Sequence, residues 1–246
     1  MGDAEISGQK ERRTSARSEG WRGLVASFPV MIGFVPFALV LGAQAAQKGF
    51  SVAEVPLMTG LNFGGGSEFA AVKLWTSPPD VLLIMAVTLL VNSRHLLMGA
   101  ALAPYLQHLP KRIVLPALFL MCDESWAIGL ADAQRRRSAG VAPSFSLPYY
   151  LSAAVGLYLT WIIFTAVGAA MGPTIGDVHA YGFDMAFVAV FLVLLKGMWK
   201  GVRAARPWFV SLAVAASTYL LVPGAWYVAA GALSGVVSAI FLSEQT

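Results

Sequence analysis

The chain has 246 residues, of which 57% are hydrophobic and only 12% are charged, with a formal net charge of +4 at pH 7. Because soluble domains carry about 25% charged residues, this composition excludes a soluble globular protein. The basic residues form short clusters beside apolar runs, which is typical of membrane orientation signals and not of nucleic-acid binding. The single cysteine, Cys122, excludes an internal disulfide and a cysteine-based metal site. We expect no metal and no cofactor.

The first 22 residues are polar and precede the first apolar run. Their basic residues are Lys10, Arg12, Arg13, Arg17 and Arg22. The apolar segment that follows, 24–46, is longer than the apolar core of a secretory signal. We therefore predict a disordered basic cytoplasmic tail over 1–22, a retained first span, and one transmembrane domain over 23–243.

Apolar runs along the chain predict an all-α, polytopic transmembrane helical bundle of about eight spans. A helix of about 20 residues crosses the roughly 30 Å apolar core of a bilayer. The predicted spans are 24–46, 55–75, 81–103, 113–130, 149–171, 185–199, 208–222 and 225–242. Two of them, 185–199 and 208–222, are short and would require local bilayer thinning or burial against other helices.

The distribution of arginine and lysine predicts the orientation. If segment 55–75 crosses the membrane, the clusters 135–137 and 200–206 fall in the cytoplasm with the N-terminus, and loop 172–184, which has no Lys or Arg, falls outside. If it only dips in and returns, the later loops invert and the triple arginine lies outside. We therefore expect 55–75 to cross and both termini to be cytoplasmic.

Segment 55–75 carries the first candidate site. Its glycines and polar residues are Asn62, Gly64, Gly65, Gly66, Ser67 and Glu68. Three successive glycines weaken a helix, and free backbone groups are tolerated at membrane depth only where they line a cavity or the protein interior. Amides at a half-helix N-terminus suit a carboxylate. The alternative is that small residues only allow close helix packing.

Three polar residues, Asn92, Arg94 and His95, interrupt the middle of span 81–103. An arginine at a helix centre costs about 2.5–3.5 kcal/mol on insertion scales, so it requires a partner. We predict a role in substrate or proton handling; the alternative is a structural ion pair between two helices.

Asp123 and Glu124 in span 113–130 are the predicted partners of Arg94. In the eight-span arrangement, Arg94 lies nine residues, about 14 Å, from the outer end of its span, and Asp123 lies about 15 Å from the same face. Adjacent helical residues point about 100° apart. One carboxylate therefore faces Arg94, and the other is left for substrate, a proton or a partner subunit.

Four motifs, in this order and spacing, resemble the AzlC/YgaZ family of branched-chain amino acid exporters. They are GFVPFALVLG with Pro36, NFGGGSEFAA, VNSRHLLM and CDESWA. The resemblance covers about residues 24–242, and the run from Asn92 to His95 is its most specific part. Family members usually have glutamine where this chain has Glu68. Pro36 itself predicts a kink in the first span or a contribution to the cavity wall.

The resemblance implies export of branched-chain or other hydrophobic amino acids across the bacterial cytoplasmic membrane. It also implies a small, separately encoded membrane partner of the AzlD/YgaH type. A zwitterion needs an anion site and a cation site, which the polar residues of 62–68, 92–95 and 123–124 can supply. The rival functions are an intramembrane hydrolase, with Ser67 or Cys122 paired to His95, and a channel or non-transporting membrane assembly subunit.

Overall fold

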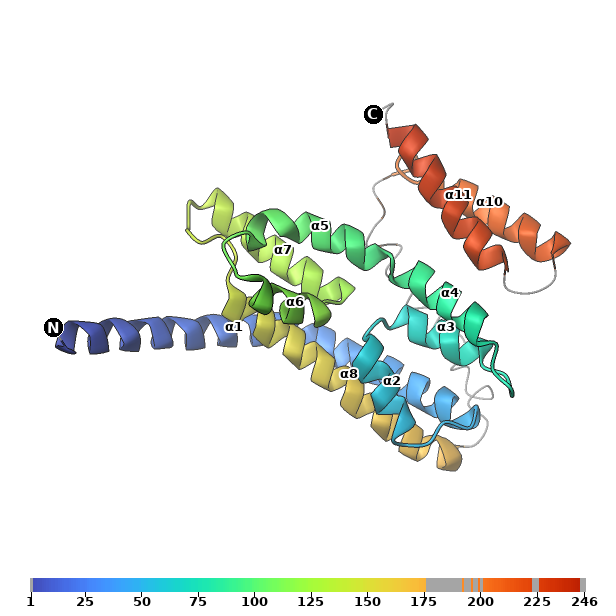
Figure 1. Cartoon of the computed structure of the whole chain (residues 1–246), viewed down its shortest axis with the longest axis horizontal. Helices are drawn as coiled ribbons and strands as arrows, with labels where there is room; N and C mark the ends of the chain where they lie inside the picture. Colours follow the sequence, from blue (N-terminus) through green and yellow to red (C-terminus); the bar gives the residue numbers. More distant parts are fainter. Residues whose placement is uncertain are drawn as a thin grey trace. The chain divides into compact units, whose positions relative to one another are not determined.

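The computed structural model describes residues 2–175, 192, 196, 199, 201–222 and 226–243. The helices in chain order are α1 (Gly2–Gln47), α2 (Glu54–Asn62), α3 (Gly66–Leu74), α4 (Val81–Asn92), α5 (Arg94–Leu106), α6 (Lys111–Phe119), α7 (Asp123–Ser138), α8 (Leu147–Ile175), α10 (Arg206–Leu221) and α11 (Trp226–Ser243) (Figure 1). No strand occurs within the described ranges, and the all-α prediction is confirmed there. The predicted span 185–199 lies largely outside them.

Within the described residues, three helices are long and apolar enough to cross a membrane on their own: Ala16–Gln47, Val81–Leu106 and Leu147–Gly172. The second of these combines α4 and α5, because Ser93 between them keeps helical dihedral angles (φ −55°, ψ −24°). A helix of nine residues, such as α2, α3 or α6, is only about 14 Å long. The predicted count of eight crossings is therefore not confirmed.

Helix α1 differs from the sequence prediction at its N-terminal end. It begins at Gly2 and continues past Pro29 and Pro36 as one helix, so residues 2–22, predicted to be a disordered tail, are helical in the structure. This stretch is rich in Glu, Lys, Arg, Gln and Ala, which favour helix. Its last residues are also anchored, since Ser152 of α8 donates a hydrogen bond to the Gly20 carbonyl at 2.7 Å.

The described residues pack as two compact units. The first consists of Met1–Glu68 and Ser93–Gly176 and contains α1, α2 and α5 to α8; the second consists of Phe69–Asn92 and Asp177–Thr246. In the second unit α10 packs against α11, where Ser211 donates a hydrogen bond to the Gly231 carbonyl at 2.7 Å.

The first unit is built around α1 and α8, which run side by side (Figure 1). A Cβ atom on Gly23 would lie 2.0 Å from the Tyr149 carbonyl oxygen, and one on Gly42 would lie 2.0 Å from that of Thr165. The two backbones therefore touch where glycine leaves room, as is common between membrane helices. Because the contacts advance along both helices together, α1 and α8 are parallel.

The predicted continuous span 113–130 is wrong. Helix α6 ends at Phe119 and α7 begins at Asp123, with Cys122 in an extended conformation (φ −120°, ψ 176°) between them. Ser125 explains this break locally, because its hydroxyl oxygen accepts the Cys122 N–H at 2.9 Å and caps the start of α7. Pro116 also removes a backbone donor from α6.

One buried cluster joins the end of α5 to the start of α8. It includes Leu106 of α5, Ala117 of α6, Ala133 of α7 and Tyr150 of α8, and the Tyr150 hydroxyl donates to the Ala117 carbonyl at 3.1 Å. The chain between α5 and α8 therefore leaves this end of the unit and comes back to it. A single helix crossing the unit from one end to the other would not return.

Candidate functional site

The glycine-rich segment breaks the helix where the sequence predicts. Helix α2 ends at Asn62, and Phe63 adopts a left-handed conformation (φ 42°, ψ 42°) with its N–H bonded to the Thr59 carbonyl at 3.0 Å. Gly65 also has a positive φ of 54°, which glycine adopts without a Cβ penalty. Helix α3 begins at Gly66.

Glu68 lies at this break and is only 1% exposed. Its Oε1 atom accepts hydrogen bonds from the Gly64 N–H at 3.0 Å and from Asn62 Nδ2 at 3.4 Å. Its Oε2 atom accepts one from Trp161 Nε1 at 2.7 Å. Asn62 Nδ2 also donates to the hydroxyl oxygen of the fully buried Ser67 at 2.8 Å. The Gly64 N–H, which the sequence suggested as a donor to a substrate carboxylate, thus donates to a carboxyl group of the protein itself.

Contacts with α8 place this break beside the midpoint of that membrane-length helix. Trp161 lies 14 residues from each end of α8 (161 − 147 and 175 − 161). The Tyr158 hydroxyl, one turn earlier, donates to the Gly60 carbonyl at 2.8 Å. The Tyr158 ring lies edge-on to Phe63 beside one break and to Phe119 beside the other, with centroid distances of 5.1 and 6.3 Å.

Arg94 connects the two helix breaks. Its NH2 donates to the Gly64 carbonyl at 2.9 Å, and its NH1 lies 2.9 Å from Asp123 Oδ2. The predicted pairing of Arg94 with Asp123 or Glu124 is therefore confirmed, with Asp123 as the partner. Roughly a third of each side chain is exposed, and Arg94 Nε has no hydrogen-bond partner within the described part of the chain.

The acidic pair occupies a different setting from the predicted one. Asp123 and Glu124 form the first turn of α7 instead of the middle of a span. Negative charge is favourable there because the helix dipole is positive at its N-terminus. These two carboxylates therefore also stabilise the start of α7.

The other predicted residues are close in sequence to Arg94, Glu68 or Asp123. His95 follows Arg94 and is half-buried, and Asn92 ends α4 in the second unit; both make interactions of their own. The described hydrogen-bond partners of the two candidate nucleophiles are Asn62 for Ser67 and Ser125 for Cys122, and neither of these partners is His95.

Trp161 is a site residue that the sequence analysis missed. Its indole N–H donates the shortest of the hydrogen bonds described for Glu68, at 2.7 Å. The usable signal was its position, since a tryptophan N–H in the middle of a span needs a buried acceptor.

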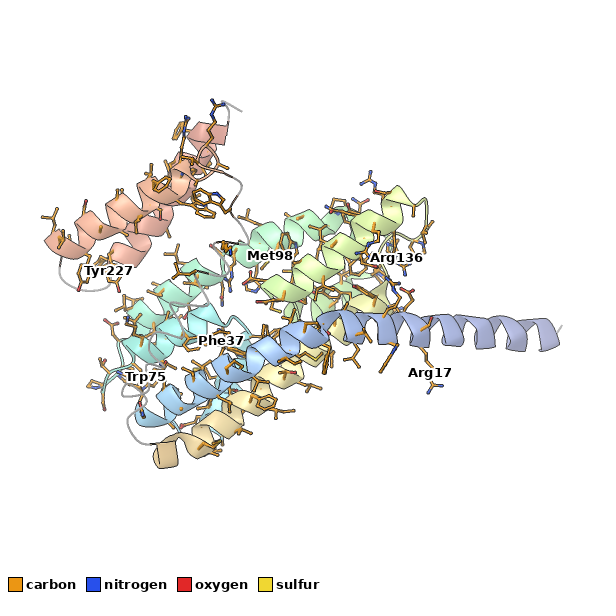
Figure 2. All side chains as sticks on the ribbon, turned by 180° about the vertical axis from the view of Figure 1, so that it is seen from behind. Arg17, Phe37, Trp75, Met98, Arg136 and Tyr227 are labelled. Carbon is orange, nitrogen blue, oxygen red and sulfur yellow. The ribbon has the colours of Figure 1, made fainter. Side chains whose placement is uncertain are left out.

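A second polar cluster, also not predicted, lies at the end of the unit where α8 begins. Arg22 of α1 contacts both Glu19 and Asp132, and Arg136 of α7 contacts the same two carboxylates; Arg136 is labelled in Figure 2. Asp132 is 2% exposed. Burial works to raise the pKa of Glu19, but hydrogen bonds from Ser146 and Arg22 and the charge of Arg136 outweigh it, so that pKa lies below its usual value.

The geometry brings the Arg94 guanidinium close to the buried Glu68 carboxyl group and to the carboxyl groups of Asp123 and Glu124, beside the middle of α8. Arg94 offers a guanidinium that can receive a carboxylate, and Glu68 and Glu124 can receive an ammonium group. No group of three or more His, Cys, Asp or Glu side chains suited to a metal ion occurs within the described residues. The cluster is therefore suited to a small zwitterion.

The family model described as AzlC protein matches residues 29–175. A membrane protein of Archaeoglobus fulgidus named only as uncharacterized is 31% identical over 75% of this chain and 78% of its own length. The branched-chain amino acid transport protein AzlC of Bacillus subtilis is 26% identical, covering 74% of this chain and 70% of its own. The inner membrane protein YgaZ of Escherichia coli is 24% identical, covering 61% and 60%. No solved structure matches. This chain belongs to the AzlC family of membrane proteins.

Proposed function

We propose that this chain is a secondary transporter that exports branched-chain or other hydrophobic amino acids across the bacterial cytoplasmic membrane. The observation that carries the proposal is the position of Arg94. This residue bonds to the Gly64 carbonyl at one helix break and to Asp123 at the other, beside the buried Glu68. The name of the Bacillus subtilis relative, a branched-chain amino acid transport protein, supports the substrate class.

The substrate site comprises the two breaks and the residues between them. The proposed binding residues are Asn62, Gly64, Gly65, Gly66, Ser67, Glu68, Asn92, Arg94, His95, Asp123 and Glu124. Arg94 receives the substrate carboxylate and the acidic residues receive its ammonium. Discontinuous helices that meet near the middle of the membrane are the usual place for such a site in transporters.

The packing of the first unit supports three crossings and two half-spanning hairpins in place of the five crossings predicted up to residue 171. With the three later spans that the sequence predicts, the total is six crossings. Because Leu106 and Tyr150 share one cluster, the chain from α5 to α8 returns to its starting side, and α6 with α7 forms a hairpin. Helices α1 and α8 are parallel, so a single crossing by α4 and α5 must connect the end of one to the start of the other. Helices α2 and α3 then form the other hairpin, entering from the outside.

This topology keeps both termini cytoplasmic. Each hairpin returns the chain to the side from which it entered. Two crossings are thereby removed before the arginines of 135–137, which therefore remain inside. Lys111 and Arg112, which an eight-crossing arrangement places outside, also fall inside. The arrangement therefore satisfies the positive-inside rule better than the eight-crossing one.

The resemblance to the family supports a second, separately encoded membrane subunit of the AzlD/YgaH type, with this chain as the large subunit of a two-component permease. Counterflow in proteoliposomes tests the function: vesicles preloaded with one amino acid should accumulate labelled leucine, isoleucine or valine. The assay is run with and without the coexpressed small subunit, so a requirement for it appears directly. Absence of counterflow for every hydrophobic amino acid in both preparations would reject transport.

A further inference from the structure

We propose that Glu68 is a proton-binding site that couples amino acid movement to protons. The inference rests on the proposed transport function and adds its coupling ion. It begins from a buried carboxyl group at the bend between α2 and α3, halfway along α8.

Hydrogen-bond donors surround Glu68, and no cation contacts it among the described residues. Helix α2 and the bend provide Asn62 and the Gly64 N–H, and α8 provides the Trp161 N–H. The nearest charged group in this chain of contacts is Arg94 of α5, which bonds to the Gly64 carbonyl and is paired with Asp123 of α7. No ion pair to Glu68 occurs among the side chains that the structure describes.

A buried charge without a counter-ion is costly, and a group in this position becomes neutral readily. Within the described part of the chain, the cluster contains one permanent cation, Arg94, and three carboxyl groups, those of Glu68, Asp123 and Glu124. The cluster can therefore accept additional positive charge. A proton taken from water on one side of the membrane and released on the other supplies that charge without a further ligand.

Among the described groups that hydrogen-bond to Glu68, one can become an acceptor for the protonated form, and it lies at the bend. A carboxylic acid O–H must donate, but the Trp161 and Gly64 N–H groups only donate themselves. The Asn62 amide can turn over, so that its oxygen accepts from both Glu68 and the Ser67 hydroxyl, where its nitrogen now donates to both. Asn62 is the last residue of α2. Proton binding is thereby connected to the residue at which the helix breaks.

In an exporter, inward movement of this proton accompanies outward movement of the amino acid. Glutamine at position 68 keeps the shape of the carboxyl group and one acceptor oxygen but takes up no proton. We therefore expect Glu68→Gln to separate exchange of the amino acid from its coupling to a pH gradient.

The experiment compares wild-type protein, Glu68→Gln and Glu54→Gln, each purified and reconstituted into liposomes. Glu54 is the matched control, because it is exposed and caps the same helix by accepting the Ser51 N–H at 2.7 Å. Counterflow without a gradient should stay within threefold of wild type in Glu54→Gln. In Glu68→Gln, which changes a proposed ligand of the ammonium group, the rate that remains without a gradient is the reference for the gradient-driven rate. Uptake driven by an imposed pH gradient should fall to the level without a gradient in Glu68→Gln and stay unchanged in Glu54→Gln.

Infrared difference spectra provide a readout that is independent of transport. Acidification should produce the carbonyl band of protonated carboxyl groups, and the component of this band that comes from Glu68 should be present in wild type and Glu54→Gln and missing in Glu68→Gln. If Glu68→Gln does not fold, Trp161→Phe serves instead: loss of a donor to the carboxylate should move the appearance of the band to more alkaline pH.

Gradient-driven uptake by Glu68→Gln at the wild-type level, or an unchanged infrared band, would overturn the proton site. An absence of counterflow in wild type, with the band present and lost in Glu68→Gln, would instead reject the transport function and leave the proton site in place.

Discussion

Replacement of Arg94 by alanine should destabilise the protein by about 3 kcal/mol. A hydrogen bond between a charged group and a carbonyl, such as that from Arg94 to Gly64 at 2.9 Å, contributes about 1.5–3 kcal/mol. The ion pair with Asp123 adds less. Because about a third of each side chain is exposed, its coupling should be about 1 kcal/mol instead of the 3–5 kcal/mol lost on breaking a fully buried pair.

A double-mutant cycle separates the contribution of the ion pair with Asp123 from that of the hydrogen bond to the Gly64 carbonyl. We compare Arg94→Ala, Asp123→Asn and the combined variant, and measure free energies of unfolding from denaturant titrations in detergent. The combined variant should be more stable than the sum of the single effects predicts, because Asp123→Asn removes the charge that Arg94→Ala leaves unpaired. Arg137, exposed in the last turn of α7, provides the control: Arg137→Ala with Asp123→Asn should be additive. Additivity of Arg94 and Asp123 within about 0.4 kcal/mol would refute the pair as a stabilising contact.

Three further predictions concern the break, the second cluster and the topology. Gly65→Val should reduce counterflow at least tenfold and Gly65→Asn should not, since a Cβ there meets nothing within 4 Å and the strain comes from the positive φ; equal rates in the two variants would contradict this. Because the pKa of Glu19 is lowered in the folded state, its contribution to stability is complete above its unfolded pKa and is lost as pH falls through the folded value. Acid unfolding followed by circular dichroism should therefore be less steep in Glu19→Gln, and identical curves would count against the cluster. In a Cys122→Ala background, a cysteine at Thr76 should be labelled from outside intact cells and one at Leu109 should not; the reverse pattern would restore the eight-crossing topology.

The sequence analysis located the break between α2 and α3 because its cause is local. Gly64, Gly65 and Gly66 stand next to one another, and their cost in a helix is independent of the rest of the fold. The alternative that small residues only allow close helix packing does not apply at Gly65, where a side chain would find open space. Its backbone conformation, and not its volume, is what requires glycine.

The break before Asp123 was not predicted because hydropathy is uninformative there. Leu120, Met121 and Cys122 are apolar, so a window over 113–130 reads as one span. The available signal was the pair of acidic residues, which are favoured in the first turn of a helix. The pairing of Arg94 with Asp123 was still predicted correctly, although Asp123 begins a new helix after a break and does not lie within a continuous span.

The contacts of Glu68 and of the second cluster could not be derived from local patterns. Trp161 lies 93 residues from Glu68, and Arg136 lies 117 residues from Glu19. Such pairs depend on the parallel packing of α1 with α8 and on the return of α7 to the same end of the unit. No periodicity in one segment specifies either arrangement.

The most direct test of the account is equilibrium binding of radiolabelled leucine, isoleucine and valine to purified protein. The decisive comparison is wild type against the combined variant Arg94→Ala with Asp123→Asn, which removes the guanidinium without leaving an unpaired charge. The account predicts saturable binding of at least one of these amino acids to wild type, and a loss of at least tenfold in affinity in the folded double variant. Binding of equal affinity to both proteins would contradict the claim that the substrate is held where Arg94 joins the two helix breaks.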